Sequence, residues 1–241
     1  MEDLSTSSNA SDRSSTPDVS KLHSSCHWYM YQARPITPPQ DAGDGDLYSH
    51  FPNLDHVEVS PVALSPALAA IWRDSTILDY GSYASIRALE HGDSPFPILK
   101  LAHPDTQSLE LIQHEFNILS DLKSLGLPVP EIDTQPIVDG GRICGYRMKA
   151  LTKLKPSELR CRQHDIRRVL LQLHSAGFCH GDVTPSNIMQ DGSDRIILID
   201  FGFAGRAGSA VPPFIPSWVY AGGIFEPTGD WKAFERFFRE P

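Results

Sequence analysis

The sequence predicts an α+β fold in which a small, β-rich lobe precedes a shortened, mainly helical lobe. Strand-like segments surround one helix up to about residue 152, a second long helix follows, and a polar loop at 180–187 leads into an apolar hairpin. We therefore expect three regions: a disordered acidic tail at 1–65, an N-terminal lobe at 66–152 and a C-terminal lobe at 153–241.

The tail differs in composition from the rest of the chain. Nine of the first twenty residues are Ser or Thr, and no period of 2.0 or 3.6 residues emerges before about residue 60. Residues 1–60 carry nine acids and three bases, a net charge of −6, which leaves −3 of the total of −9 for the other 181 residues. This distribution gives no sign of a nucleic-acid-binding surface, so we expect no nucleic-acid partner.

The bulk composition also bounds the location. No run approaches the roughly 20 apolar residues of a membrane span, and the acidic, Ser-rich start lacks the apolar stretch of a secretory signal. Four scattered cysteines without CxxC spacing favour reduced thiols. We therefore expect an intracellular protein, cytoplasmic or nuclear, with no membrane partner. His23, Cys26 and His27 lack further ligands at zinc spacing, so we expect no metal site in the tail.

The N-terminal lobe begins with strand-like segments. "TILDYG" and "SIRALEH" flank Gly81, and "FPILKLA" supplies a third strand. A hairpin is predicted over 131–151, with its turn at Asp139-Gly140-Gly141. The turn at Gly81 carries only one glycine, and a plain hairpin without a ligand-binding role is the alternative for it.

Two long helices are predicted from apolar residues spaced three and four apart. The first covers 108–126 and the second 164–177, and Gly126 and Gly177 are plausible stops. The expected core-facing stripes are Leu109, Ile112, Phe116 and Leu119 in the first helix, and Ile166, Val169, Leu170 and Leu173 in the second.

A lysine and a glutamate occupy positions that look buried. Lys100 lies in the apolar strand "ILKLA", and Glu115 falls within the arc of Ile112, Leu119 and Leu122 on the first helix. A buried charge is costly unless an opposite charge meets it, so an ion pair between the two is indicated. A glutamate at the edge of the stripe that bends towards water is the alternative.

Three oxygen-bearing side chains follow the second helix. Asp182 and Asn187 share a loop that Pro185 keeps from continuing the helix, and Asp200 follows the apolar strand "RIILI". The hairpin between them can bring Asn187 and Asp200 to one spot, where an amide oxygen and a carboxylate suit Mg²⁺. Asp182 is then left to accept a proton from an incoming hydroxyl.

The segments "LHSAGFCHGDVTPSNIM", "IDFG" and "ILKLA" together resemble the protein-kinase-like superfamily over roughly residues 75–240. The residues that fall on the spacing of its catalytic loop are Leu173, His174, Gly177, His180, Asp182 and Asn187. The resemblance implies a two-lobed kinase-like fold and the use of ATP and Mg²⁺.

The resemblance also implies roles for individual residues. Asp182 would be the catalytic base, and Asn187 and Asp200 the metal ligands. Lys100 would contact the α- and β-phosphates, Glu115 would orient it, and the turn at Gly81 would approach the phosphates. His180 would be a structural residue of the loop.

The sequence departs from that family in several places. Gly181 replaces the usual arginine, so a phosphorylated activation loop would have no obvious partner and such regulation is not expected. "HGD" is instead similar to aminoglycoside-type phosphotransferases and to small atypical kinases of the Bud32 and Rio kind. Thr184 stands where Ser/Thr kinases carry a lysine, which removes one charge from the site of transfer.

The chain extends only 39 residues beyond Gly202. "GDWKAFERFF" is similar to the start of the central helix of the C-terminal lobe, where Asp230 would either brace the catalytic loop or act as an N-cap. Cover for the phenylalanines at 234, 237 and 238 is not obvious. They would pack on the helix at 164–176, mark an interface with a protein partner, or reflect a truncated gene product.

These features favour an ATP- and Mg-dependent phosphotransferase, foremost a small protein serine/threonine kinase. A small-molecule phosphotransferase of the aminoglycoside- or choline-kinase-like type is the first alternative, because "HGD" and Thr184 favour it. A pseudokinase scaffold is the second. The expected partners are therefore ATP and a protein or small-molecule hydroxyl acceptor.

Overall fold

The structure is a computed structural model that describes residues 29–31, 59–61 and 64–238, and the chain divides into the units Met1–Ala63 and Leu64–Pro241. In the first unit, β1 (Tyr29–Tyr31) pairs antiparallel with β2 (Val59–Pro61). Most of the predicted tail, including the cluster of His23, Cys26 and His27, lies outside the described residues. The tail and the two lobe boundaries therefore stay predictions.

The second unit alternates strands and helices. Its N-terminal elements are α1 (Pro66–Arg73), β3 (Ser75–Tyr80), β4 (Ala84–Leu89), β5 (Ile98–Ala102), α2 (Thr106–Ser124), β6 (Ile137–Asp139), β7 (Arg142–Met148) and β8 (Thr152–Lys153). Its C-terminal elements are α3 (Pro156–Cys161), α4 (Gln163–Ser175), β9 (Phe178–Cys179), η3 (Pro185–Asn187), β10 (Ile188–Gln190), β11 (Ile196–Leu198), η4 (Phe201–Phe203), β12 (Gly205–Arg206) and α5 (Thr228–Phe238).

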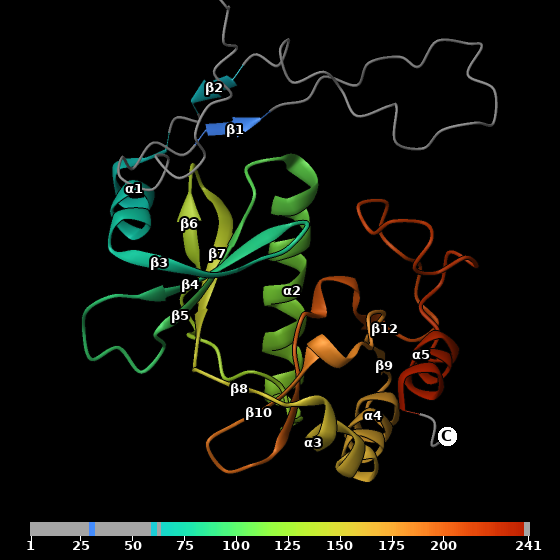
Figure 1. The fold of residues 1–241 in the computed structure, drawn as a ribbon. Helices are drawn as coiled ribbons and strands as arrows, with labels where there is room; N and C mark the ends of the chain where they lie inside the picture. Colours follow the sequence, from blue (N-terminus) through green and yellow to red (C-terminus); the bar gives the residue numbers. More distant parts are fainter. Residues whose placement is uncertain (1–28, 32–58, 62–63, 239–241) are drawn as a thin grey trace, which may run out of the picture. The chain divides into compact units, whose positions relative to one another are not determined.

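A five-stranded antiparallel sheet with the order β3-β4-β5-β7-β6 forms the N-terminal lobe (Figure 1). The three strands around Gly81 and the hairpin at 131–151 are thereby confirmed. Gly140 and Gly141 both have positive φ, 55° and 79°, which is the geometry of a tight hairpin turn that suits the twist of the strands. The α+β class with a β-rich first lobe is confirmed.

The two faces of this sheet have different neighbours because side chains alternate along a strand. Leu99 and Leu101 on β5 pack with Leu68 and Ile71 of α1. Lys100, between them, points to the other face, where its amine meets α2. Because side chains alternate along β5, its one charged residue, Lys100, lies on the face of the sheet that packs against α2.

Helix α2 connects the sheet with the C-terminal segments. It begins after Asp105, whose side chain accepts a hydrogen bond from the Ser108 amide, and it packs on β7 and η4. Three of the predicted stripe residues join the main core, but Leu109 is half-buried and packs with the cluster beneath α1. The helix thus contributes to the packing of both lobes.

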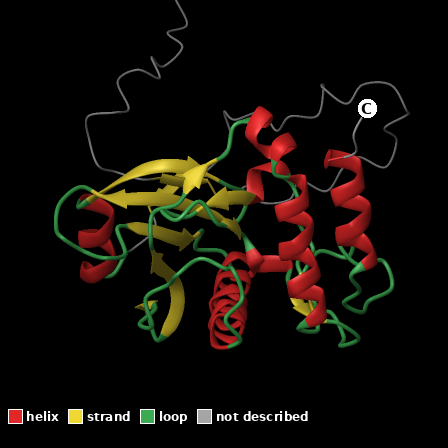
Figure 2. Ribbon diagram, turned by 90° about the horizontal axis from the view of Figure 1, so that it is seen from below, coloured by secondary structure: helices red, strands yellow, loops and turns green. Residues whose placement is uncertain are grey.

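The C-terminal lobe combines helices with two small sheets, β11-β10-β8 and β12-β9. In the unit that starts at Leu64, strands gather on one side and most helices on the other (Figure 2). Helix α5 contacts α4, and Phe238 is buried in the main core with Phe234 packed against it, while Phe237 stays 44% exposed. Packing on α4 therefore covers two of the three phenylalanines.

None of the helices in the described part of the chain is long and apolar enough to cross a membrane.

Candidate active site

One pocket of about 440 Å³ brings together every residue that the sequence predicts for the site. They come from the β3–β4 turn, β5, α2, the loop after β9, η3 and the residue before η4: Gly81, Lys100, Glu115, Asp182, Asn187 and Asp200. Lys100 and Glu115 lie more than 60 residues before the segment that carries Asp182, Asn187 and Asp200, so the tertiary fold assembles the pocket.

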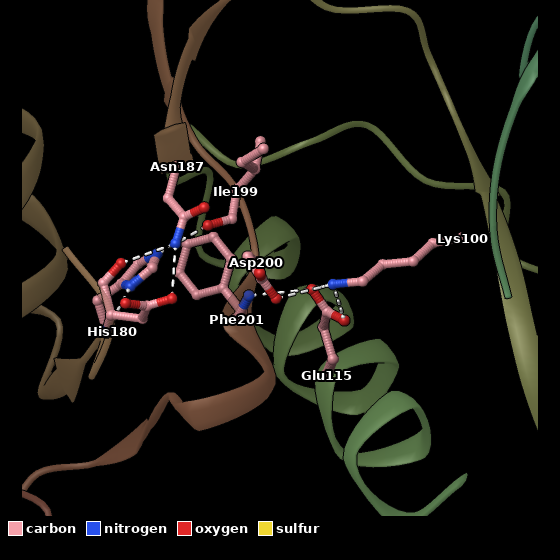
Figure 3. A network of polar contacts seen from close by, with 8 residues as sticks. Lys100, Glu115, His180, Asn187, Ile199, Asp200 and Phe201 are labelled. Atoms are coloured by element: carbon pink, nitrogen blue, oxygen red, sulfur yellow. Dashed lines mark hydrogen bonds and ion pairs between the residues drawn. The ribbon is translucent and has the colours of Figure 1, made fainter. Parts of the chain in front are cut away.

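Lys100 stands at the centre of a charged network (Figure 3). Its Nζ lies 2.8 Å from Oε1 and 2.7 Å from Oε2 of Glu115, and 2.8 Å from Oδ1 of Asp200. Oε1 of Glu115 also accepts a hydrogen bond of 3.0 Å from the Phe201 amide. The glutamate therefore holds both the lysine and the backbone next to Asp200.

The electrostatics follow from burial and charge. Burial alone would lower the pKa of Lys100, but the carboxylates of Asp200 and Glu115 outweigh it and hold the pKa well above its usual value. The same lysine lowers the pKa of Asp200. Lys100 therefore stays cationic and Asp200 anionic at neutral pH. Burial raises the pKa of Glu115, the partner that the sequence predicts, and the charge of Lys100 opposes that shift.

Asp200 has an unusual backbone. Its φ of 66° and ψ of 65° place it in the left-handed region, which is costly for a residue with a Cβ and persists only when its surroundings hold it. Two contacts stabilise this backbone conformation: the ion pair of Asp200 with Lys100, and the hydrogen bond from the neighbouring Phe201 amide to Glu115. The side chain is 47% exposed, so a carboxylate oxygen faces the pocket.

Asn187 and Asp182 are hydrogen-bonded to each other within the loop at 180–187. Nδ2 of Asn187 donates to the Asp182 backbone oxygen at 2.9 Å and to its Oδ2 at 2.8 Å. Both amide protons are thus used, and Oδ1 of Asn187 is left to bind a cation. Burial raises the pKa of Asp182, and the negative charge of Asp200 adds to it.

Asp230 of α5 holds the loop at 180–187 in place through hydrogen bonds. Oδ2 accepts hydrogen bonds from the His180 amide at 2.8 Å and from Nε2 of His174 at 2.9 Å, and Oδ1 accepts from the Gly181 amide at 2.8 Å. The side chain is 2% exposed and lies in the first turn of α5, which begins at Thr228. The bracing alternative is therefore correct, and the N-cap alternative is wrong.

His180 has the structural position that the resemblance implies. The residue is fully buried; its Nδ1 accepts from the Asp182 amide at 3.2 Å, and its Nε2 donates to the Ile199 oxygen at 3.0 Å. These two partners fix the neutral tautomer with the proton on Nε2. The ring thereby connects the loop to Ile199, the residue between β11 and Asp200.

Gly181 fills a position that no side chain could share. Its φ is +83°, and a Cβ there would lie 2.5 Å from the Tyr220 hydroxyl and 2.6 Å from the Phe203 oxygen. The Tyr220 hydroxyl donates to that same oxygen at 3.1 Å. Tyrosine packing thus occupies the space beside Gly181, in keeping with the absence of an arginine.

The β3–β4 turn closes the pocket on the sheet side. The Gly81 amide donates to the Ala84 oxygen at 2.9 Å, and the Gly81 oxygen accepts from Nε2 of His103 at 2.9 Å. Within residues 64–238, the amides of Ser82 and Tyr83 have no hydrogen-bond acceptor. Two backbone donors next to the pocket are therefore available to an anionic ligand.

Sequence reasoning missed several residues of the site. Tyr146 is the cross-strand neighbour of Lys100 on β7, a register that only strand pairing reveals. Lys153 and Trp218 also line the pocket, and neither belongs to a recognisable spacing. Among the described residues, no group of three or more His, Cys, Asp or Glu could hold a metal ion.

Comparisons with known proteins agree with this geometry. Residues 146–207 match the Phosphotransferase enzyme family. A protein assigned as a bifunctional tRNA threonylcarbamoyladenosine biosynthesis protein in Natronomonas pharaonis is 32% identical over 130 residues, which cover 52% of this chain and 24% of the relative.

Two further relatives are kinases by name. A serine/threonine-protein kinase BUD32 homologue assigned in Archaeoglobus fulgidus is 29% identical, covering 52% of this chain and 62% of the relative. A mitogen-activated protein kinase 14C assigned in Drosophila melanogaster is 25% identical, covering 52% and 30%. The chain spans less than two thirds of the length of these curated relatives. Together, the matches and the assembled pocket show that the chain is similar to the protein-kinase-like superfamily, and in particular to small kinases of the Bud32 type.

Proposed function

We propose that the protein is an ATP- and Mg-dependent phosphotransferase, foremost a small serine/threonine kinase. The observation that carries the proposal is the convergence of Lys100, Glu115, Asp182, Asn187 and Asp200 on one pocket. A charged lysine, a proton acceptor and two oxygen donors are the parts that phosphoryl transfer needs in one place.

The residues present fit a magnesium ion. Oδ1 of Asn187 and the ionised carboxylate of Asp200 are hard oxygen ligands, and both line the pocket. Mg²⁺ bound there would neutralise charge on the phosphates of ATP. With only two protein ligands, phosphate oxygens and water would complete its octahedron, as is usual for this ion.

The other residues have separate tasks. Lys100 would contact the α- and β-phosphates, Glu115 holds it in place, and the turn at Gly81 offers the free amides of Ser82 and Tyr83. Asp182 would accept the acceptor's hydroxyl proton. The acceptor oxygen then bonds to the γ-phosphorus, the bridging bond to the β-phosphate breaks, and ADP leaves with that electron pair.

A small-molecule acceptor is the second candidate. The match to the Phosphotransferase enzyme family supports it, and so does Thr184, which supplies no positive charge beside the loop. The relatives named as protein kinases favour a protein acceptor.

The test is turnover of Mg-ATP by the purified full chain, with a general protein acceptor and with a panel of small hydroxyl compounds. Asp182→Ala and Asp200→Ala should each lower the rate by about 10²–10⁴-fold. Asp93→Ala, which removes an exposed carboxylate outside the pocket, should leave it unchanged. A wild-type protein that binds nucleotide yet never turns it over would establish the scaffold alternative instead.

A further inference from the structure

The turn between β3 and β4 is closed on one side by a backbone hydrogen bond and on the other by a side chain. The Gly81 amide donates to the Ala84 oxygen at 2.9 Å, but within residues 64–238 no backbone amide donates to the Gly81 oxygen. A hydrogen-bonded pair of residues in an antiparallel hairpin normally exchanges two such bonds. The conformation of this turn therefore depends on what else binds the Gly81 oxygen.

His103, in the connection between β5 and α2, supplies that donor. Its Nε2 donates to the Gly81 oxygen at 2.9 Å, a normal length for an N–H···O hydrogen bond. Its backbone amide also donates to the Tyr83 oxygen at 3.0 Å. One residue therefore holds the turn at two points, Gly81 through its ring and Tyr83 through its main chain.

The ring of His103 is in turn oriented by Tyr80. The two rings are stacked, with centroids 4.7 Å apart and 28° between their planes. The Tyr80 hydroxyl, which can donate a proton, lies 3.5 Å from Nδ1, whereas Nε2 faces a carbonyl oxygen, which can only accept one. These neighbours favour the ring with its proton on Nε2, as the hydrogen bond to Gly81 requires.

The connection that carries His103 has a restricted backbone. It joins the end of β5 to the start of α2, where Pro104 limits the backbone and the side chain of Asp105 caps the helix. β5 carries Lys100 and α2 carries Glu115. The ring of His103 therefore fixes the turn to the same connection that joins the two residues of the buried ion pair.

The tip of the turn lies at the pocket. Ser82 and Tyr83 line it, and within residues 64–238 neither of their amides has an acceptor. Successive free amides in a turn make a concave site for an anion. How well these two donors meet a phosphate depends on the position of the turn, so a residue that fixes the turn also governs phosphate binding.

We propose that His103 is a positioning residue for the phosphates of the nucleotide: its ring holds the β3–β4 turn in place for the amides of Ser82 and Tyr83 to bind them. His103 does not line the pocket, so it acts through the turn and not by contact with the ligand. The inference rests on the proposed function and deepens it, because it identifies what fixes a phosphate-binding turn that carries a single glycine.

The test compares His103→Ala and His103→Gln with the wild type, each as the full chain. Alanine removes the ring but keeps the main-chain hydrogen bond to Tyr83, whereas the side-chain amide of glutamine can donate to the Gly81 oxygen in place of Nε2. His91→Ala is the matched control, because it removes an exposed histidine of the same lobe that lies outside the pocket.

Calorimetric titration with a non-hydrolysable ATP analogue and Mg²⁺, and separately with adenosine, gives the first measurement. His103→Ala should weaken binding of the analogue about three- to tenfold, the effect of one lost hydrogen bond, and leave the binding of adenosine unchanged. His103→Gln and His91→Ala should bind both ligands as the wild type does. An equal loss for both ligands, or no loss for the analogue in His103→Ala, overturns the role of His103.

Hydrogen exchange of the Gly81 amide, followed by NMR without any ligand, keeps the two proposals separate. The amide should exchange about three- to tenfold faster in His103→Ala than in the wild type, and at nearly the wild-type rate in His103→Gln. An unchanged rate in His103→Ala overturns the hold of the ring on the turn. A wild type that shows this exchange pattern but binds no nucleotide would instead overturn the proposed function.

Discussion

Glu115 on α2 and Asp230 on α5 are two buried carboxylates that hold two halves of the same site. They are 1% and 2% exposed. Glu115 is paired with a cation, Lys100, and also accepts the Phe201 amide. Asp230 accepts two loop amides and the ring of His174. One carboxylate therefore depends on a charge that faces the ligand pocket, and the other on backbone amides of the loop and on the ring of His174 in α4.

The two carboxylates therefore have different tasks: Glu115 positions a group that would contact a ligand, and Asp230 fixes the conformation of the loop. Lys100 lies between Glu115 and the half-exposed Asp200, so the glutamate's partner is also a group that a phosphate would contact. The partners of Asp230 lie in the loop and in α4, and the pocket is not lined by Asp230. Changes at Glu115 should therefore alter both stability and nucleotide binding, whereas changes at Asp230 should first destabilise the fold.

The largest effect is expected for Asp230→Ala. Three hydrogen-bond donors would lose their acceptor in a buried place, which should lower the free energy of unfolding by about 3–6 kcal/mol. Urea denaturation followed by circular dichroism measures the loss. Lys232→Ala, at an exposed position of the same helix, is the control. A loss below about 1 kcal/mol would show that the brace contributes little.

The next effect concerns the buried ion pair. Lys100→Met should destabilise the protein by about 3–5 kcal/mol, because the buried Glu115 loses its cation. Glu115→Gln should cost less, because Lys100 keeps Asp200 as a partner. The double variant should lose less than the sum, since neither charge then remains, although the Phe201 amide keeps only the glutamine oxygen. Denaturation of all four proteins completes the cycle. Strictly additive losses would contradict a direct coupling.

The smallest effect concerns His114, the neighbour of Glu115. Its Nε2 donates to the Ala204 oxygen at 2.7 Å, and burial lowers its pKa, with that carbonyl opposing the shift. A histidine with a lowered pKa is protonated more readily when unfolded, so stability falls as the pH drops below about 6.5. His114→Gln should therefore lose less stability than the wild type between pH 7.5 and pH 5. Urea denaturation of both proteins at both pH values tests this. If the free energy of unfolding changes equally with pH in the wild type and in His114→Gln, the attribution to His114 is wrong.

The two carboxylates also differ in how far they can be predicted from the sequence. Lys100 and Glu115 are predictable because each is a charge set in an apolar pattern of its own element. Asp182, Asn187 and Asp200 are predictable because they lie on one short segment, where a loop carboxylate, an amide and a carboxylate after an apolar strand suit a proton acceptor and a cation site. Asp230 is harder, since its partners lie about 50 residues earlier and depend on how α5 packs on α4.

Two further features could not be predicted from the sequence, because they also depend on tertiary packing. The need for glycine at Gly181 comes from Tyr220, a neighbour only in the folded chain. The position of Trp218 at the pocket depends on its contact with Phe203 and on the anchoring of its segment to α2. Apolar period and local spacing therefore predict the elements and the central residues, while the contacts that fix their geometry require the tertiary structure.

The central claim is that Asn187 and Asp200 hold one divalent cation together with ATP beside Asp182. Calorimetric titration with a non-hydrolysable ATP analogue, in Mg²⁺ and in EDTA, tests it most directly on the wild type, Asp200→Ala and the control Asp93→Ala. The account predicts that Mg²⁺ tightens binding about tenfold or more in the wild type and the control, and that Asp200→Ala loses this gain. The same gain in all three proteins would contradict it.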